Sequence, residues 1–289
     1  GGTIKLDGNY PNGTANVALG NAALDTASGS NGYSVAIGNN ALTAMTTGGS
    51  NTVVGAGAAV AINSGANNVA LGTDALTSTT SASFNTAVGS AALQSNTTAS
   101  NNTAVGYQAA YNNTTGQEIT AVGRFALNAN TTGSNSTATG VQSLQSNTTG
   151  ADNASFGRLG LGANTTGSNN TSVGSAALRN NTTAIGNTAV GFQAGYANTT
   201  GINNTAVGKD SLLTATTASD NVAVGREAMK RATTGHSNTG IGTEALKETT
   251  TGAYNTALGN DALQSNTNAS NNTAVGFEAG LSTTTGAQN

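Results

Sequence analysis

Residues 100–116 read SNNTAVGYQAAYNNTTG, and the word NTAVG inside this stretch recurs, with variants, along the whole chain. The glycines that close these copies follow a constant 17-residue period from Gly38 onward, and only the first interval, from Gly20 to Gly38, is one residue longer. Such a constant period indicates a solenoid, because every copy must follow the same backbone path with no room for insertions. The repeat glycines are Gly20, Gly38, Gly55, Gly72, Gly89, Gly106, Gly123, Gly140, Gly157, Gly174, Gly191, Gly208, Gly225, Gly242, Gly259 and Gly276.

The composition is that of a polar, weakly charged repeat. Charged residues make up 7% of the 289 residues, the net charge is −3, and Pro11 is the only proline. Disorder usually requires high net charge and abundant proline, so we expect this chain to be ordered through its regularity. The absence of cysteine excludes disulfides and cysteine-based metal sites. No apolar run approaches the ~20 residues of a membrane helix, and the weakly acidic balance gives no electrostatic reason to expect nucleic acid.

Each repeat is predicted to hold two short β-strands and two turns. In the word NTAVG, Thr103 and Val105 point to one face and Ala104 to the other. A second apolar pair follows the glycine, as in Ala126-Leu127, and the polar segment 130–135 is rich in turn-forming residues. β-branched residues with frequent glycine disfavour helix. We therefore predict an all-β parallel β-solenoid of about sixteen coils over residues 16–289, with residues 1–15 as an N-terminal cap or the end of a preceding segment.

The expected core is thin, because each coil buries only two or three apolar side chains, chiefly from the Val and Leu columns. Here a column means the residues at the same place in successive coils. The column Asn102, Asn153, Asn170, Asn187 and Asn204 is expected to form a hydrogen-bonded ladder between coils. The middle strand column is almost all Ala or Ser, and we expect it to form a flat outer face. A thin core and a flat face predict a homo-oligomer, with a trimer as the leading arrangement.

The strand words resemble those of a known family. NVALG (16–20), SVAIG (34–38), NVALG (68–72) and NTAVG (102–106) are similar to the strand motif in the head domains of trimeric autotransporter adhesins. The longer unit also resembles repeat arrays of bacteriophage tail fibres and bacterial surface proteins. The resemblance implies a left-handed β-roll, three rolls packed side by side, and a place on a bacterial surface or virion tail. The 17-residue period is longer than usual for the adhesin heads, and no stalk, neck or membrane anchor is evident.

Three signals for chemistry are weak. Residues 55–59 (GAGAA) look like a dinucleotide-binding loop, but Gly55 is the repeat glycine and no strand-loop-helix unit surrounds it. His236 is the only histidine and lies in a turn, where a solvated role is expected. The carboxylates Asp210, Glu227, Glu244, Asp261 and Glu278 share one column, and the nearby cations Lys209, Arg226, Lys230, Arg231 and Lys247 favour a surface salt-bridge ladder over a hydrolase or metal site. We expect no catalytic residue, cofactor or metal.

Stacked threonines offer a second reading of the surface. Pairs such as Thr114-Thr115 and Thr131-Thr132 recur in successive coils, and flat threonine ranks on a β-solenoid are how some ice-binding proteins present their face. These pairs lie in predicted turns, so a turn-forming role is favoured and an ice-binding face is kept as the alternative.

Aromatic residues mark a second period in the sequence. Tyr107 and Tyr111 flank Ala110, which replaces the usual leucine; Phe192 and Tyr196 flank Gly195; Phe277 and Leu281 flank Gly280. Five coils separate Tyr107 from Phe192, and five more separate Phe192 from Phe277. A small residue beside large apolar neighbours favours a repacked core or a chain–chain contact. A sugar-stacking platform is the alternative.

These observations predict a structural, non-catalytic extracellular fibre or shaft segment that contributes to attachment to a host cell or surface. Its expected partners are further copies of itself and a cell-surface glycan or protein receptor. An ice-binding or surface-adsorbing solenoid is the second hypothesis, and a polysaccharide-cleaving spike is the third.

Overall fold

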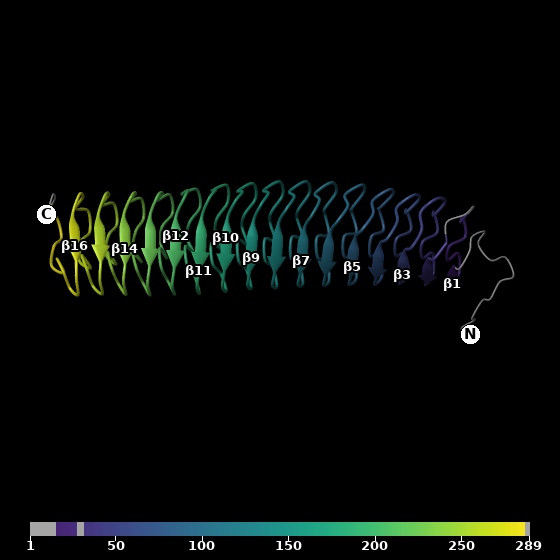
Figure 1. The fold of residues 1–289 in the computed structure, drawn as a ribbon, viewed down its shortest axis with the longest axis horizontal. Coiled ribbons are helices and arrows are strands. Elements are labelled where there is room, and N and C mark those ends of the chain that lie inside the picture. The colour runs from purple at the N-terminus through teal and green to yellow at the C-terminus, as the bar shows by residue number, and fades with distance from the viewer. Residues whose placement is uncertain (1–15, 28–31, 287–289) are drawn as a thin grey trace. The chain divides into compact units, whose positions relative to one another are not determined.

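The computed structural model describes residues 16–27 and 32–286, so the cap predicted at 1–15 lies outside the described residues. It is an all-β parallel β-solenoid of about sixteen coils, and its described residues contain no helix (Figure 1). Each coil supplies one three-residue strand. The predicted second strand is wrong, since the Ala-Leu segment after each repeat glycine is a turn. The strands are β1 (Val17–Leu19), β2 (Val35–Ile37), β3 (Thr52–Val54), β4 (Val69–Leu71), β5 (Thr86–Val88), β6 (Thr103–Val105), β7 (Thr120–Val122), β8 (Thr137–Thr139), β9 (Ala154–Phe156), β10 (Thr171–Val173), β11 (Thr188–Val190), β12 (Thr205–Val207), β13 (Val222–Val224), β14 (Thr239–Ile241), β15 (Thr256–Leu258) and β16 (Thr273–Val275).

The coils fall into two compact units, the first with β1–β8 and the second with β9–β16. Within each unit successive strands pair in parallel and in register, so that each column continues from coil to coil. In the first unit Thr103 lies opposite Thr120 and Val105 opposite Val122. In the second, Thr188 lies opposite Thr205 and Val190 opposite Val207. The strict register follows from the constant period, because one inserted residue would turn every strand side chain to the opposite face.

The repeat glycines are required by the backbone. The φ angles of Gly106, Gly123, Gly140, Gly157, Gly174, Gly191 and Gly208 lie between 127° and 137°, a region that residues with a Cβ rarely adopt. A Cβ at Gly106 would also lie 2.7 Å from the carbonyl carbon and oxygen of Gly123 on the next coil. Glycine therefore lets the chain turn after each strand and lets neighbouring coils approach closely.

The two faces of the strands are the reverse of the sequence prediction. Ala104 and Ala189 are completely buried, whereas Val105 is half-buried and Val190 is exposed. The space inside a coil explains this arrangement. A Cβ at the strand residue Gly240 would lie 3.1 Å from Cγ of Met229 on the opposite wall. Where a leucine or methionine faces the strand, the space suits a small side chain, so the Ala column lines the core and the Val column faces outward. The larger Val53 is buried in this column in a coil where Ala59 replaces the leucine.

The predicted burial of the Leu column is confirmed. Leu93, Leu127, Leu178 and Leu263 are buried, with φ angles of 48° to 50°. A left-handed conformation at a residue with a Cβ costs roughly 1–2 kcal/mol. The turn holds these leucines in that conformation and so directs them into the core, where their burial offsets the cost.

The predicted asparagine ladder is also confirmed. The Nδ2 atoms of Asn170, Asn187 and Asn204 each donate to Oδ1 of the asparagine one coil earlier, at 3.2, 3.3 and 3.1 Å. A second buried ladder was not predicted. It runs through Asn113 and Asn130, which donate to Asn96 and Asn113 at 3.1 and 2.8 Å, and through Asn181, which donates to Asn164 at 2.8 Å.

Candidate functional site

In each unit, the residues one, two and five places after the repeat glycines lie on one side of the coils, which we call the post-glycine face. Contacts in the second unit show that these three columns are neighbours. Arg226, one place after its glycine, pairs with Glu244, two places after the next glycine, at 2.7 Å. Lys247, five places after its glycine, pairs with Glu244 at 2.9 Å and with Glu227 of the previous coil at 3.0 Å. Side chains from these columns can therefore act together on one ligand.

The predicted salt-bridge ladder is confirmed for Asp210, Glu227 and Glu244, whereas Asp261 and Glu278 form no salt bridge within the described residues. Besides the pairs above, Glu227 lies 3.3 Å from Arg226 and 3.4 Å from Lys230, and Arg231 lies 2.9 Å from Glu248 on the next coil. The hydrogen bond from Lys247 lowers the pKa of both Glu227 and Glu244, and the same bonds raise the pKa of Lys247. Both carboxylates are held ionised and paired, which is the opposite of what a general acid needs. In the described ranges no group of three or more His, Asp or Glu side chains could hold a metal ion.

The aromatic residues of the five-coil period lie on the post-glycine face. Tyr107, Phe192 and Phe277 are 49%, 48% and 72% exposed, while Tyr111 and Tyr196 are half-buried. Their position outside the coil means that these side chains do not fill the space of the missing leucines. The prediction that Tyr107, Phe192 and Phe277 fill the core of this chain is therefore wrong. A contact between chains and a sugar-stacking platform remain predictions for these residues.

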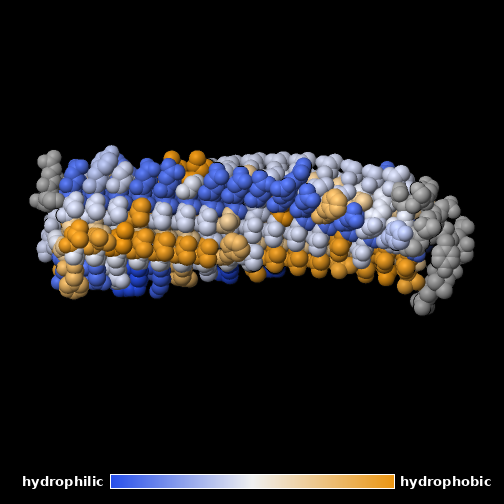
Figure 2. All heavy atoms as spheres, viewed as in Figure 1, coloured by the Kyte–Doolittle hydropathy of each residue, from blue (hydrophilic) through white to orange (hydrophobic). Residues whose placement is uncertain are grey.

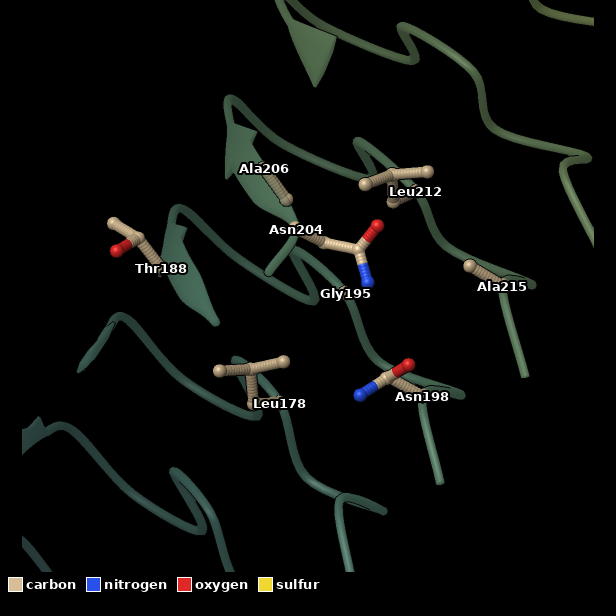
Figure 3. A pocket seen from close by; sticks show the side chains of 8 residues that line it. All are labelled: Leu178, Thr188, Gly195, Asn198, Asn204, Ala206, Leu212 and Ala215. Carbon is tan, nitrogen blue, oxygen red and sulfur yellow. The ribbon is translucent and has the colours of Figure 1, made fainter. Parts of the chain in front are cut away.

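The space left by one missing leucine remains partly open. Gly195 lies on the coil between those of Leu178 and Leu212 and borders a small cavity (Figure 3). Leu178 leans into the gap, with Cδ2 3.0 Å from the place where a Cβ of Gly195 would lie. The buried Oδ1 of Asn198, which lines the cavity, has no hydrogen-bond partner. The space holds no more than about one water molecule, far below the ~300 Å³ of a typical ligand pocket.

The GAGAA segment, His236 and the Thr-Thr pairs, which the sequence analysis singled out, have structural positions in the coils. Gly55 and Gly57 have φ angles of 149° and 67° in the turn that follows every strand, so the GAGAA segment is an ordinary coil turn. His236 is exposed, and its ring meets that of Tyr254 edge to face at 5.1 Å. In the Thr-Thr turns, the first hydroxyl bonds to the next coil, as Thr114 Oγ1 donates to the carbonyl of Thr131 at 2.9 Å.

The outer face of the strands is a second candidate surface, and the sequence prediction placed it on the wrong side of the sheet. In each coil it carries the first and third strand residues, such as Thr103 and Val105. In the second unit Val173, Val190, Ile241, Leu258 and Val275 all expose more than a third of their surface. Figure 2 shows hydrophobic residues gathered in a band along the strands of each unit. The sequence showed only that side chains alternate between the two faces of each strand, and this alternation does not tell which face is buried.

Comparison with known proteins gives no family. No family model matches the chain, and a search of curated proteins finds no significant match. Within the described part of the chain, no helix is long and apolar enough to cross a membrane.

Proposed function

We propose that the chain is a structural, non-catalytic segment of an extracellular fibre that mediates attachment to a host cell or surface. A bacteriophage tail fibre and a bacterial surface adhesin are the two settings that the strand words suggest. Stacked coils of constant register support a structural role, because such stacks form stiff elements whose surfaces repeat at a fixed spacing. The ion-paired carboxylates and the very small size of the cavity beside Gly195 offer little for catalysis.

The proposal includes a side-by-side homotrimer of left-handed coils. The observation that carries it is the apolar outer face of the strands, with Val105 and Val122 half-buried and Val173 and Val190 exposed in a single chain. Soluble monomers rarely leave a long contiguous apolar band in water. Packing this face against the same face of other copies would bury the apolar band along each unit, and a closed symmetric ring of copies ends the association.

The oligomer is tested by mass. Sedimentation equilibrium of the unmodified chain should give three times the monomer mass. A variant with Val105→Lys and Val190→Lys should dissociate, because each lysine places a charge in the apolar contact. The control Thr115→Lys and Thr200→Lys alters exposed turn residues and should leave the mass unchanged. A monomer mass for the unmodified chain at low concentration would refute the homotrimer.

Attachment is tested separately with whole cells. Fluorescently labelled chain, kept at the oligomeric state found above, should adsorb saturably to the surface of at least one bacterial species in a diverse panel. Unlabelled chain should compete with it. The absence of saturable, competed binding across the panel would contradict the attachment function while leaving the structural role intact.

Ice binding is the second candidate, and one observation favours it. The turn threonines of the sequence prediction lie in bends, but the strand threonines Thr103, Thr120 and Thr137 stand in register on the sheet itself. A row of threonines on a β-sheet forms a flatter surface than a row of threonines in turns. An ice recrystallisation assay decides: inhibition that Thr103→Lys and Thr120→Lys abolish would support this candidate, and no inhibition would remove it.

A further inference from the structure

The post-glycine face carries the same set of side chains at two places. In the first unit the set is Tyr107, Gln108 and Tyr111, with Arg124 one coil later at the place of Tyr107. In the second unit it is Phe192, Gln193 and Tyr196, with Lys209 one coil later at the place of Phe192. We call these the first and second aromatic sites. Each therefore combines an aromatic ring, an amide, a phenol and a cation.

The columns of each site are close enough to act together. The contacts of Glu227, Glu244 and Lys247 show that the second and fifth places after the glycine are within reach of one another. The pair of Arg226 with Glu244 shows the same for the first and second places on adjacent coils. The backbone follows the same path in every coil, so Gln108 lies beside Tyr111 and next to the columns of Tyr107 and Arg124.

The first aromatic site is held in place and remains accessible. The ring of Tyr107 packs edge to face against that of Phe125, with centroids 5.4 Å apart and planes at 69°. The guanidinium of Arg124 lies 4.9 Å from the centroid of Phe125. Because Tyr107 packs against Phe125 and is still 49% exposed, its ring is available to a ligand at little cost in side-chain entropy.

The charge at both sites is positive. Arg124 is exposed, and no carboxylate within the described ranges forms a salt bridge with it. At the second aromatic site Lys209 lies 3.7 Å from Asp210 but keeps 60% of its side chain exposed. Arg179 adds a further cation there, since its Nη1 donates to the hydroxyl of Tyr196 at 3.1 Å.

We propose that the two aromatic sites bind sugar residues that carry a carboxylate, within an acidic cell-surface polysaccharide. This rests on the proposed attachment function and names its ligand class. The exposed ring of Tyr107 or Phe192 stacks on the apolar C–H face of the sugar ring. Gln108 or Gln193 hydrogen-bonds the sugar hydroxyls, and Arg124 or Lys209 pairs with the carboxylate.

The spacing of the sites favours a sugar over a second copy of this chain. Parallel copies packed side by side need an apolar column that continues from coil to coil, as the Val column does on both sides of its one polar member, Thr139. The column of Tyr107 does not continue in this way, because Ser90 precedes it and Arg124 follows it. In this column the aromatic residues of the series return only after five coils, and each follows a polar residue one coil earlier, namely Ser90, Ser175 or Asn260.

The third aromatic of the series supplies a matched control. Phe277 lies in the same column, but Glu278 replaces the glutamine and Leu281 replaces the tyrosine. A carboxylate in place of the amide repels an acidic sugar. The ring at Phe277 is therefore expected to contribute nothing to binding.

The test measures the Kd of the unmodified chain for oligomers of galacturonic acid by calorimetry, with galactose oligomers as the neutral counterpart. The acidic oligomers should bind, more weakly at high salt, and the neutral ones much less. Tyr107→Ser with Phe192→Ser should raise the Kd at least about tenfold. Arg124→Gln with Lys209→Gln should remove the preference for the acidic oligomers, and Phe277→Ser should change nothing.

The following outcomes would overturn the inference. The unmodified chain could fail to bind acidic oligomers, the tyrosine and phenylalanine replacements could leave the Kd unchanged, or those replacements could change the sedimentation mass. The last result would assign the rings to a contact between copies. Cell adsorption that persists in the Tyr107→Ser, Phe192→Ser variant would refute the sugar sites and keep the attachment function, whereas loss of binding for every chain on every cell would refute both.

Discussion

Asn102 and Asn113, which belong to the two interior ladders, donate to the same acceptor. Their Nδ2 atoms lie 3.0 and 2.9 Å from the backbone carbonyl oxygen of Gly116. The same convergence recurs at Gly167, where Asn153 and Asn164 donate at 2.8 and 2.9 Å. The two ladders thus hold the N-T-T-G turn from inside the coil, and they satisfy polar groups that would be costly to bury unpaired.

The first prediction compares two asparagines of the same ladder. Asn130 donates to the carbonyl of Gly133 at 2.9 Å. No second asparagine donates to Gly133, because Ile119 takes the place that Asn102 has one coil earlier. Asn130→Ala leaves the Gly133 carbonyl without an asparagine donor, whereas Asn113→Ala leaves Gly116 bonded to Asn102. We expect Asn130→Ala to lower the free energy of unfolding by about 1–3 kcal/mol more than Asn113→Ala does. Chemical denaturation of both variants measures this, and equal losses would contradict it.

The second prediction compares a turn glycine with a repeat glycine. A Cβ at Gly116 would meet the Gly133 carbonyl oxygen, but Gly116 has no positive φ, and alanine occupies its column at Ala99 and Ala184, so the backbone there can shift to admit a methyl group and Gly116→Ala should cost less than Gly106→Ala. Gly106→Ala places a Cβ on a backbone with a φ of 135° and against the Gly123 carbonyl, so it should cost several kcal/mol or prevent folding. Thermal unfolding followed by circular dichroism compares the two. A similar melting temperature for both variants would show that coils can separate at the repeat glycine.

The third prediction concerns pH. The folded-state pKa of Glu227 and Glu244 lies below the ordinary 4.5, chiefly because of the hydrogen bond from Lys247. Their contribution to stability is therefore present above about pH 4.5 and is lost as the pH falls through the folded-state pKa. The folded-state pKa of Lys247 lies above its ordinary 10.5, so its contribution is lost as the pH rises through the folded value.

Replacing one carboxylate tests this pH dependence. Glu244→Gln should flatten the fall in melting temperature below about pH 4.5, because that variant no longer has the paired carboxylate to protonate. Glu278→Gln is the control, since Glu278 is exposed and forms no salt bridge within the described ranges. Added salt should weaken the difference between the unmodified chain and Glu244→Gln. An acid transition that is identical in both chains would assign the pH dependence to other groups.

The fourth prediction is a double-mutant cycle across the core. Met229 replaces the usual leucine, and Gly240 on the facing strand replaces the usual alanine, with a hypothetical Cβ only 3.1 Å from Cγ of Met229. Gly240→Ala alone favours folding by lowering the conformational entropy of the unfolded chain, but its Cβ meets Met229. We therefore expect the free energy of unfolding to rise little or to fall. With Met229→Leu added, the alanine should stabilise the chain by about 0.5–1 kcal/mol. Denaturation of the two single variants and the double variant measures the coupling, and simple additivity would contradict the volume match.

Several features were predictable because they depend on local chemistry and register. A constant 17-residue period places identical residues above one another, so the ladder of Asn170 and Asn187 and the pairing of Glu227 with Lys247 follow from spacing alone. The second asparagine ladder was missed because its residues sit in the N-T-T-G segment, where asparagine also has an ordinary role in turns. The pair of Met229 and Gly240 was missed because the two residues belong to different coils and different columns.

The sequence by itself determined the period, the parallel register, the glycine turns and the burial of the leucines, because each follows from a repeat that allows no insertion. Only the tertiary structure decided which strand face is inside. Alternation distinguishes Ala104 from Val105, but the choice depends on the space inside the coil, where the side chains facing the strand leave little room: alanine fills most of this column, and the larger Val53 is buried there in a coil where Ala59 replaces the usual leucine. The valines therefore face outward, and the surface available to another copy is apolar and β-branched instead of a flat row of alanines.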